Sequence, residues 1–240
     1  RNILNKDAYK PLPMGDGQNL ALRLQSSRTF STYSFSFTEP WLGGRKPQSL
    51  SFSVYSSNQY QFNFQTGDVD RSQSLGIVGA SLGLGKRLKW PDDFFQLSQS
   101  ISYQAFNLKN YGFRVGQNIL SNGNLNNLSY SATISRNSAG PSLIFPTYGS
   151  EFSLGIRATF PYSLVNGRDY TIDDNLSQED RNARIAENYK WLEYYKASIK
   201  GKWYTSFTDK LVLMTNAEMG YLGYYNPKIG LSPFERYYVG

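Results

Sequence analysis

The stretch Phe152-Ser153-Leu154-Gly155-Ile156-Arg157-Ala158-Thr159-Phe160 places an apolar side chain at every second position. Successive side chains of a strand point to opposite faces of a sheet, so this spacing predicts a strand with one apolar and one polar face. The same alternation recurs along the whole chain. It predicts about nine strands, near residues 18–28, 30–42, 48–60, 72–88, 94–108, 124–138, 148–162, 191–207 and 211–225.

The predicted strands are long, and most approach the roughly nine to eleven residues that a tilted strand needs to cross a bilayer. Aromatic residues are abundant, with 19 Tyr and 15 Phe among 240 residues, yet the mean hydropathy is −0.50. A soluble Greek-key or lipocalin-like protein would also alternate. It explains less well a face made almost purely of Ser, Gly, Gln, Lys and Arg over so many long strands. We therefore predict an all-β fold, a transmembrane antiparallel β-barrel.

The connections between the predicted strands alternate in length. Short turns are expected near 43–47, 91–93 and 208–210, and long polar loops at 58–74, 107–127 and 164–190. Short periplasmic turns and longer extracellular loops are typical of outer-membrane barrels. Within the longest loop, residues 177–187 read as a short helix with Ser177 as N-cap. We interpret this helix as a solvated loop element rather than as a docking site for an accessory protein.

The composition argues against covalent chemistry. The chain has no Cys and no His, which removes the commonest general base and the usual ligands of structural zinc. We expect no enzyme activity, no cofactor and no metal. The net charge of +7 is distributed over loops and alternate strand positions, so nucleic-acid binding is a weak interpretation.

Several charged residues fall on the predicted polar face, which would line the barrel lumen. Two readings are open: these side chains line an anion pathway, or they pair with one another and with polar neighbours. We favour the structural reading. The residues are Arg23, Arg157, Lys196, Lys200, Lys202 and Glu218.

Three motifs interrupt the strands at specific places. Pro40 can end a strand and Trp41 can sit at the membrane interface, while Pro146 and Gly149 suit a tight turn before a new strand. The residues that define the motifs are Glu39, Pro40, Trp41, Gly43 and Gly44 in the first, Phe145, Pro146, Thr147 and Gly149 in the second, and Pro233, Phe234, Glu235 and Gly240 in the third.

In this order and spacing, the three motifs resemble the barrel domain of the BamA family of outer-membrane assembly factors. The form Thr-Glu-Pro-Trp-Leu-Gly-Gly at 38–44 is similar to its Bacteroidetes branch. The resemblance covers the whole chain. It implies a barrel of about sixteen strands, of which about nine are present here, with 226–240 as the start of a loop that folds into the lumen. Periplasmic POTRA domains are absent from this chain, which begins without Met and looks like a fragment.

The resemblance implies a function without covalent catalysis: folding and inserting β-barrel proteins into the bacterial outer membrane. The implied partners are unfolded outer-membrane proteins, accessory lipoproteins or outer-membrane subunits, and outer-membrane lipid. Two alternatives remain open. One is a TamA-like or two-partner secretion translocation pore of the same superfamily, and the other is a solute-conducting porin.

Overall fold

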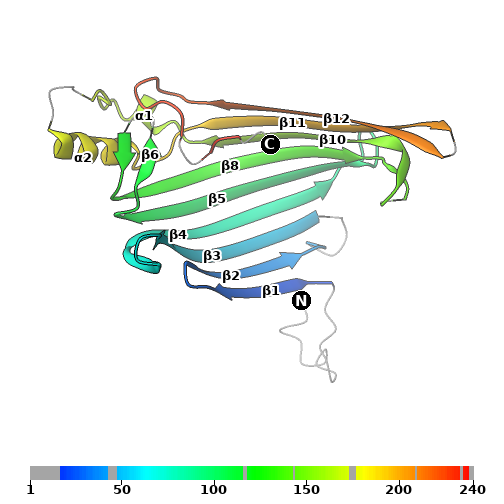
Figure 1. Ribbon diagram of the computed structural model, residues 1–240. Coiled ribbons are helices and arrows are strands. Elements are labelled where there is room, and N and C mark those ends of the chain that lie inside the picture. Colours follow the sequence, from blue (N-terminus) through cyan, green and yellow to red (C-terminus); the bar gives the residue numbers. More distant parts are fainter. Residues whose placement is uncertain are drawn as a thin grey trace, which may run out of the picture.

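The chain forms one large antiparallel sheet in the computed structural model, which describes residues 17–42, 48–115, 118–142, 144–172, 177–208, 210–232 and 235–237 (Figure 1). The motif residues Gly43, Gly44, Pro233, Phe234 and Gly240 lie outside these ranges. Within them, no helix has the length and apolar character needed to cross a bilayer.

Nine long strands follow one another across the sheet, each antiparallel to its neighbour. In spatial order they are β1 (Asn19–Ser26), β2 (Phe30–Glu39), β3 (Gln48–Asn63), β4 (Asp68–Arg87), β5 (Phe95–Lys109), β8 (Gly123–Asn137), β10 (Pro146–Thr159), β11 (Tyr195–Thr208) and β12 (Leu211–Gly223). The short strand β9 (Gly140–Pro141) pairs with β10, and β6 (Phe113–Val115) pairs with β7 (Asn118–Leu120) in a separate hairpin. The predicted antiparallel all-β class is confirmed.

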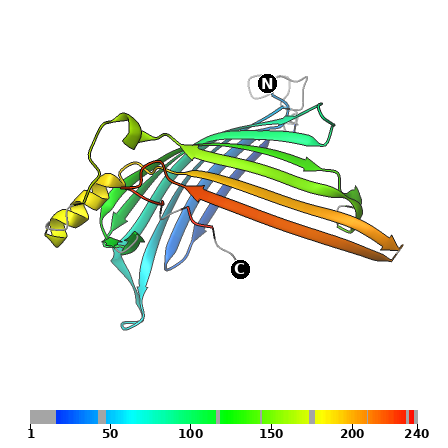
Figure 2. The ribbon, with the colours of Figure 1, turned by 90° about the horizontal axis from the view of Figure 1, so that it is seen from above.

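The register gives the sheet one apolar and one polar face. Across β4, β5 and β8, Leu82 lies opposite Ile101, which lies opposite Tyr130, and all three side chains are strongly exposed. One residue further along, Ser81, Ser102 and Ser129 form a polar row on the other face. An apolar face this extensive on a monomer marks a surface that is covered by lipid or protein. The sheet is also curved, as the view from above shows (Figure 2).

Two of the predicted strand boundaries are wrong. The expected long loop at 58–74 is a hairpin: β3 continues to Asn63, β4 begins at Asp68, and only four residues turn between them. Tyr60, Phe62 and Phe64 continue the alternation of β3, but the facing residues 68–74 are polar except for Val69, so no alternation marked the second strand. The predicted strand at 148–162 ends earlier, because Pro161 has no N–H to donate and the short helix α1 (Tyr162–Val165) follows.

Almost all buried apolar residues gather at the end of the sheet that carries the long loops. There the polar face itself becomes apolar, at Leu75, Phe106, Leu108 and Leu125, and loop residues pack onto it. The loop residues of this cluster are Leu120, Tyr170, Ile185, Tyr189, Leu192, Tyr194 and Ile229. We call this covering structure the loop cap. It closes one end of the sheet's polar face, whereas the strands themselves bury little.

The helix α2 (Gln178–Asn188) belongs to the loop cap. Ser177 is its N-cap, as predicted, and accepts a hydrogen bond from the amide of Asp180 at 3.2 Å. The helix is more than a solvated element, because Ile185 is 1% exposed and packs into the cap. Beside it, hydrogen bonds from Lys228 and Thr171 hold the pKa of Asp169 well below its ordinary value, so this carboxylate stays charged and ties the loop to the chain after β12.

Candidate functional site

The polar face of the sheet is lined by small hydroxyl side chains that bond to each other across strands. Ser53 and Ser81 are 2.7 Å apart, Ser100 and Ser131 are 2.8 Å apart, and a third pair joins Ser102 to Ser129 at 2.9 Å. Cross-strand hydroxyl pairs of this kind stabilise a sheet while leaving its surface wettable. A polar inner surface opposite an apolar outer one is the arrangement of an outer-membrane barrel wall.

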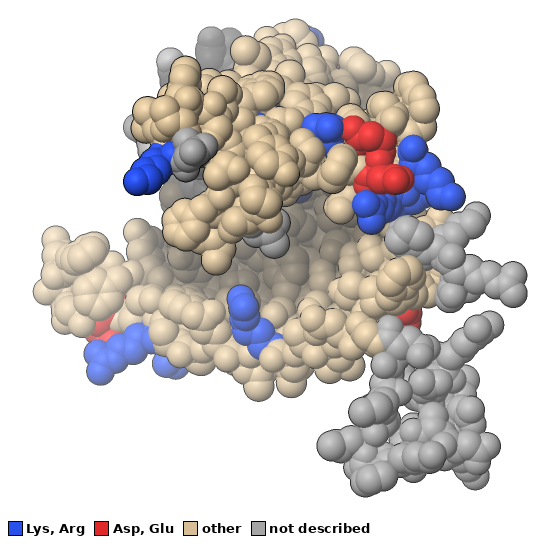
Figure 3. All heavy atoms as spheres, turned by 90° about the vertical axis from the view of Figure 1, so that its right-hand side faces the viewer, with Lys and Arg blue, Asp and Glu red and all other residues tan. Residues whose placement is uncertain are grey.

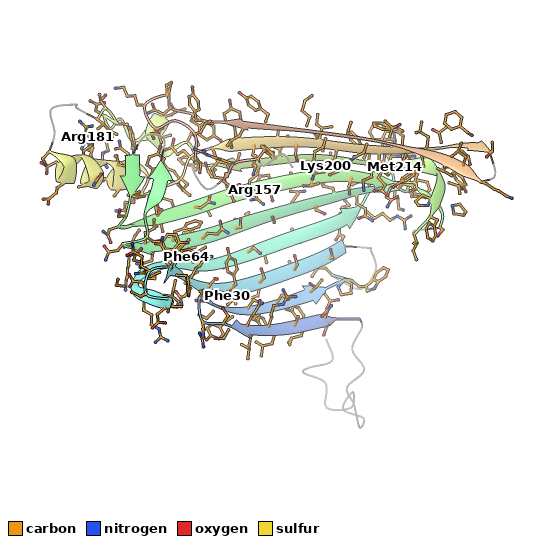
Figure 4. The ribbon with its side chains drawn as sticks, in the orientation of Figure 1. Phe30, Phe64, Arg157, Arg181, Lys200 and Met214 are labelled. Atoms are coloured by element: carbon orange, nitrogen blue, oxygen red, sulfur yellow. The ribbon has the colours of Figure 1, made fainter. Side chains whose placement is uncertain are left out.

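A group of charged side chains lies on the same face, over β10, β11 and β12. By register Arg157 lies opposite Lys196, and Lys200 lies opposite Glu218. Figure 4 labels Arg157 and Lys200, and Figure 3 shows the hollow of the molecule from the end with the short turns. The ion pairs within this group are Lys200 with Glu218, Lys202 with Glu151 at 3.7 Å, Lys196 with Glu235 at 3.1 Å and Arg157 with Glu235 at 3.7 Å.

Glu235 is the centre of the tightest part of this group. Its side chain is 13% exposed and that of Lys196 is 20% exposed. Besides the two cations, Glu235 accepts a hydrogen bond from the Tyr194 hydroxyl at 3.1 Å. A carboxylate so enclosed needs these partners, because burying a charge without them is costly. Four side chains, Glu235, Arg157, Lys196 and Tyr194, therefore form a clasp on the polar face.

The clasp fixes the chain that follows β12. This returning segment (224–232 and 235–237) folds back over the polar face instead of leaving the sheet. Tyr225 donates to the carbonyl of Thr159 at 3.0 Å, and Tyr237 donates to the carbonyl of Ala197 at 2.8 Å. Lys196 lies 4.4 Å from the centre of the Tyr237 ring, a cation–π contact. The described residues of the predicted lumen loop thus lie on the face that the sequence assigned to the lumen.

Arg23 shares the polar face but not the charged group. It lies on β1 opposite Ser34, at the far edge of the sheet from β11. Among the residues that the structure describes, it forms no ion pair. The six charged residues singled out in the sequence therefore fall on one face, with five of them together and Arg23 apart.

The middle motif is a strand irregularity rather than a turn before a strand. β10 already begins at Pro146, and the register of β10 on β9 shifts between Pro146 and Tyr148. Gly149 has φ of +96°, and a Cβ there would come within 2.2 Å of the Ser138 carbonyl oxygen. Only glycine fits this close approach. Thr147 lies between these positions within β10, and Phe145 just before the strand is 77% exposed.

The first motif ends β2 at the short-turn end of the sheet. The carboxylate of Glu39 accepts hydrogen bonds from the Gln18 side chain and, at 3.2 Å, from the Trp41 amide. Pro40 ends the strand, and Trp41 is half exposed, as is expected of an aromatic residue at a membrane interface.

Three participants, Glu151, Tyr194 and Tyr237, were missed in the sequence analysis. Glu151, which pairs with Lys202, follows the period-two pattern of β10 and could have been assigned to the polar face from that pattern. Tyr194 and Tyr237 could not, because their contacts depend on how the loop cap and the returning segment fold. No group of three acidic, His or Cys side chains gathers among the described residues. The arrangement can hold chain segments and water, and it contains paired charges rather than an open row of one sign.

Three comparisons with known proteins bear on this wall. The profile of a family described as the Omp85 superfamily domain matches residues 14–240. Among solved structures, BamA from Haemophilus ducreyi lacking POTRA domains 1–3 is similar, with a TM-score of 0.59 and 16% sequence identity over 91% of this chain. The match covers 37% of that protein, so this chain spans little more than a third of its length. No curated protein matches the sequence.

Proposed function

The chain belongs to the Omp85 superfamily and contributes to the wall of a β-barrel in the bacterial outer membrane, and from this premise we propose that the full protein folds and inserts other β-barrel proteins into that membrane. Membership of the superfamily rests on the match over residues 14–240. The features of the polar face support the insertase role.

The clasp at Glu235 carries the proposal. It holds the returning segment across the polar face, in the space through which a porin would pass solutes. The cations that could select anions in a porin are instead paired with carboxylates, since Arg157 and Lys196 share Glu235, and Lys200 pairs with Glu218. A lumen that is occupied by its own chain suits a protein that works at its wall rather than through its pore.

The physical logic of such an insertase is exchange of edge strands. An unpaired strand edge inside lipid leaves backbone donors and acceptors without partners, which is costly, so an opened seam captures an incoming strand. The wall described here would remain rigid while the seam opens. Its long strands, cross-strand hydroxyl pairs and loop cap supply that rigidity.

The proposed partners follow from this activity. Unfolded outer-membrane proteins would arrive from the periplasm at the end that carries the short turns. The exposed apolar face would contact lipid, and accessory lipoproteins or outer-membrane subunits would complete the machinery. No cofactor or covalent step is part of the proposal.

Controlled depletion of the full-length protein tests the proposal. We expect unrelated outer-membrane barrels to lose their folded, heat-resistant form and to accumulate as unfolded chains in the periplasm. Normal assembly of those barrels after depletion would contradict the insertase role. If a single secreted protein were lost instead while barrels still assembled, the translocation pore of the same superfamily would be the better assignment.

The porin alternative has its own discriminating measurement. The full protein reconstituted in a planar bilayer should show only small and intermittent conductance, because the returning segment lies in the lumen. A large, steady open pore with anion preference would favour a solute channel over an insertase.

A further inference from the structure

A groove lies on the outward, apolar side of the sheet, at the end that carries the long loops. It has a volume of about 690 Å³ and crosses β3, β4, β5 and β8 next to the hairpin whose tip, Phe64, is labelled in Figure 4. By register, Asn58, Gly76, Asn107 and Asn124 form one row across these strands. The row sits one pleat beyond Val78, where the exposed apolar residues of β4 begin. The outer face thus changes from apolar to amide-rich at this level.

The groove is open because its floor is a glycine. A Cβ at Gly76 would come within 3.1 Å of Asn58 Oδ1 and 3.7 Å of Asn107 Cβ. The wall on the other side is ordered: Asn107 donates to Asn124 at 2.7 Å, and the Tyr103 hydroxyl donates to Asn126 at 2.7 Å. Side-chain amides and a tyrosine at this depth are suited to hydroxyl and phosphate groups rather than to hydrocarbon.

Two cationic side chains, Arg71 and Lys109, line the groove, and no acidic residue lines it. Arg71 lies in the three-residue irregularity of β4, where the register on β3 shifts between Tyr60 and Gln61. Such bulges re-aim side chains. Lys109 is at the end of β5, opposite Ser74. In the part of the chain that the structure describes, neither cation forms an ion pair. The neighbouring acid, Asp70, is engaged with Ser72 and Gln73.

A second hollow of about 420 Å³ continues from the groove into the apolar face. It is almost entirely apolar, and Val78 lines both spaces. The small side chain of Ala80 leaves room between larger neighbours on the adjoining strands. These are Leu22, Leu24, Tyr33, Phe35, Val54 and Tyr103. The two spaces together offer a cationic, amide-lined upper part and an apolar lower part, in the order in which a lipid presents its headgroup and acyl chains.

We propose that this composite groove binds a phosphorylated glycolipid of the outer leaflet, with phosphate at Arg71 and Lys109, sugar hydroxyls at the asparagine row, and an acyl chain over Ala80. Arg binds phosphate through paired N–H donors, and clustered cations at a membrane surface recognise anionic headgroups. The site depends on the outer-membrane location of the barrel and not on the insertase role.

Native mass spectrometry of the purified full-length protein tests the site. The probe is diphosphorylated lipid A, compared with the same lipid lacking its phosphates, with phosphatidylglycerol and with inorganic phosphate. Arg71→Gln with Lys109→Gln should weaken binding of the diphosphorylated lipid about tenfold. Gly76→Leu, which fills the groove without changing charge, should weaken it similarly. The matched control, Arg28→Gln with Lys210→Gln, removes two cations that do not line the groove and should bind as the wild type does.

Three results would overturn the proposal. Equal binding by the groove variant and the control would show that net charge, not the groove, attracts the lipid. Equal retention of the dephosphorylated lipid or of phosphatidylglycerol would remove the assigned headgroup chemistry. Displacement of the lipid by an equal concentration of inorganic phosphate would reduce the site to a simple anion site.

Discussion

Replacing Glu235 by Gln should loosen the returning segment from the polar face. At 3.1 Å, Lys196 and Glu235 attract each other by roughly 5 kcal/mol at an effective dielectric constant of about 20, before desolvation is subtracted. The net loss is smaller, about 2 kcal/mol. Gln keeps an oxygen that accepts hydrogen bonds, which limits the loss, but Arg157 and Lys196 lose their counter-charge. A loss of that size raises the population of the detached segment about thirtyfold.

Hydrogen–deuterium exchange of the folded, full-length protein measures this population directly. Amides of the returning segment should exchange about thirtyfold faster in Glu235→Gln than in the wild type, while amides of β10 and β11 stay protected. Glu218→Gln is the matched control, because Glu218 and Lys200 are both more than half exposed and such pairs contribute little. If Glu235→Gln exchanges no faster than Glu218→Gln, the clasp does not hold the segment.

Two further substitutions test the strand irregularity and the two faces of the wall. Gly149→Ala should destabilise the folded barrel by at least ~2 kcal/mol in urea titrations. The control Gly167→Ala should cost only about 1 kcal/mol, because Gly167 has φ of +63° but nothing within 4 Å of an added Cβ. Equal losses would refute the close approach of Gly149 to Ser138. Ile101→Arg on the apolar face of β5 should lower the free energy of unfolding from the bilayer by ~2–4 kcal/mol, and Ser98→Arg on the polar face of β5 should lower it by under ~1 kcal/mol. The reverse order would contradict the assigned faces.

The strands were predictable because their constraint is local. A strand between lipid and water needs apolar and polar side chains at alternate positions, and stretches such as 152–160 show this alternation directly in the sequence. The alternation is weaker where the strands extend beyond the bilayer. In the hairpin beyond Asn58, Tyr60, Phe62 and Phe64 still alternate, but the returning strand at 68–74 is polar except for Val69, so the pair read as a loop. The extension was therefore missed for a physical reason and not by chance.

The candidate site was predictable only in part. Alternation assigned Arg157, Lys196 and Lys200 to one face, but it could not reveal that Glu235 pairs with Arg157, 78 positions away in the chain. That contact depends on where the returning segment folds. Glu235 was singled out only as part of a motif that carries the family resemblance. The Bacteroidetes-type character of the motif at 38–44 remains a prediction from the sequence.

The two-faced wall itself is tested most directly by single labels on alternate residues of one strand. Residues 1–240 contain no Cys, so once any Cys elsewhere in the full protein is replaced, an environment-sensitive fluorophore can be attached at Leu82→Cys or, one residue away, at Ser81→Cys, in lipid vesicles. Brominated lipids should quench the label at position 82 strongly and leave the label at position 81 quenchable by iodide from water. Equal quenching of both labels by lipid, or the opposite preference, would contradict the account of this chain as an outer-membrane barrel wall.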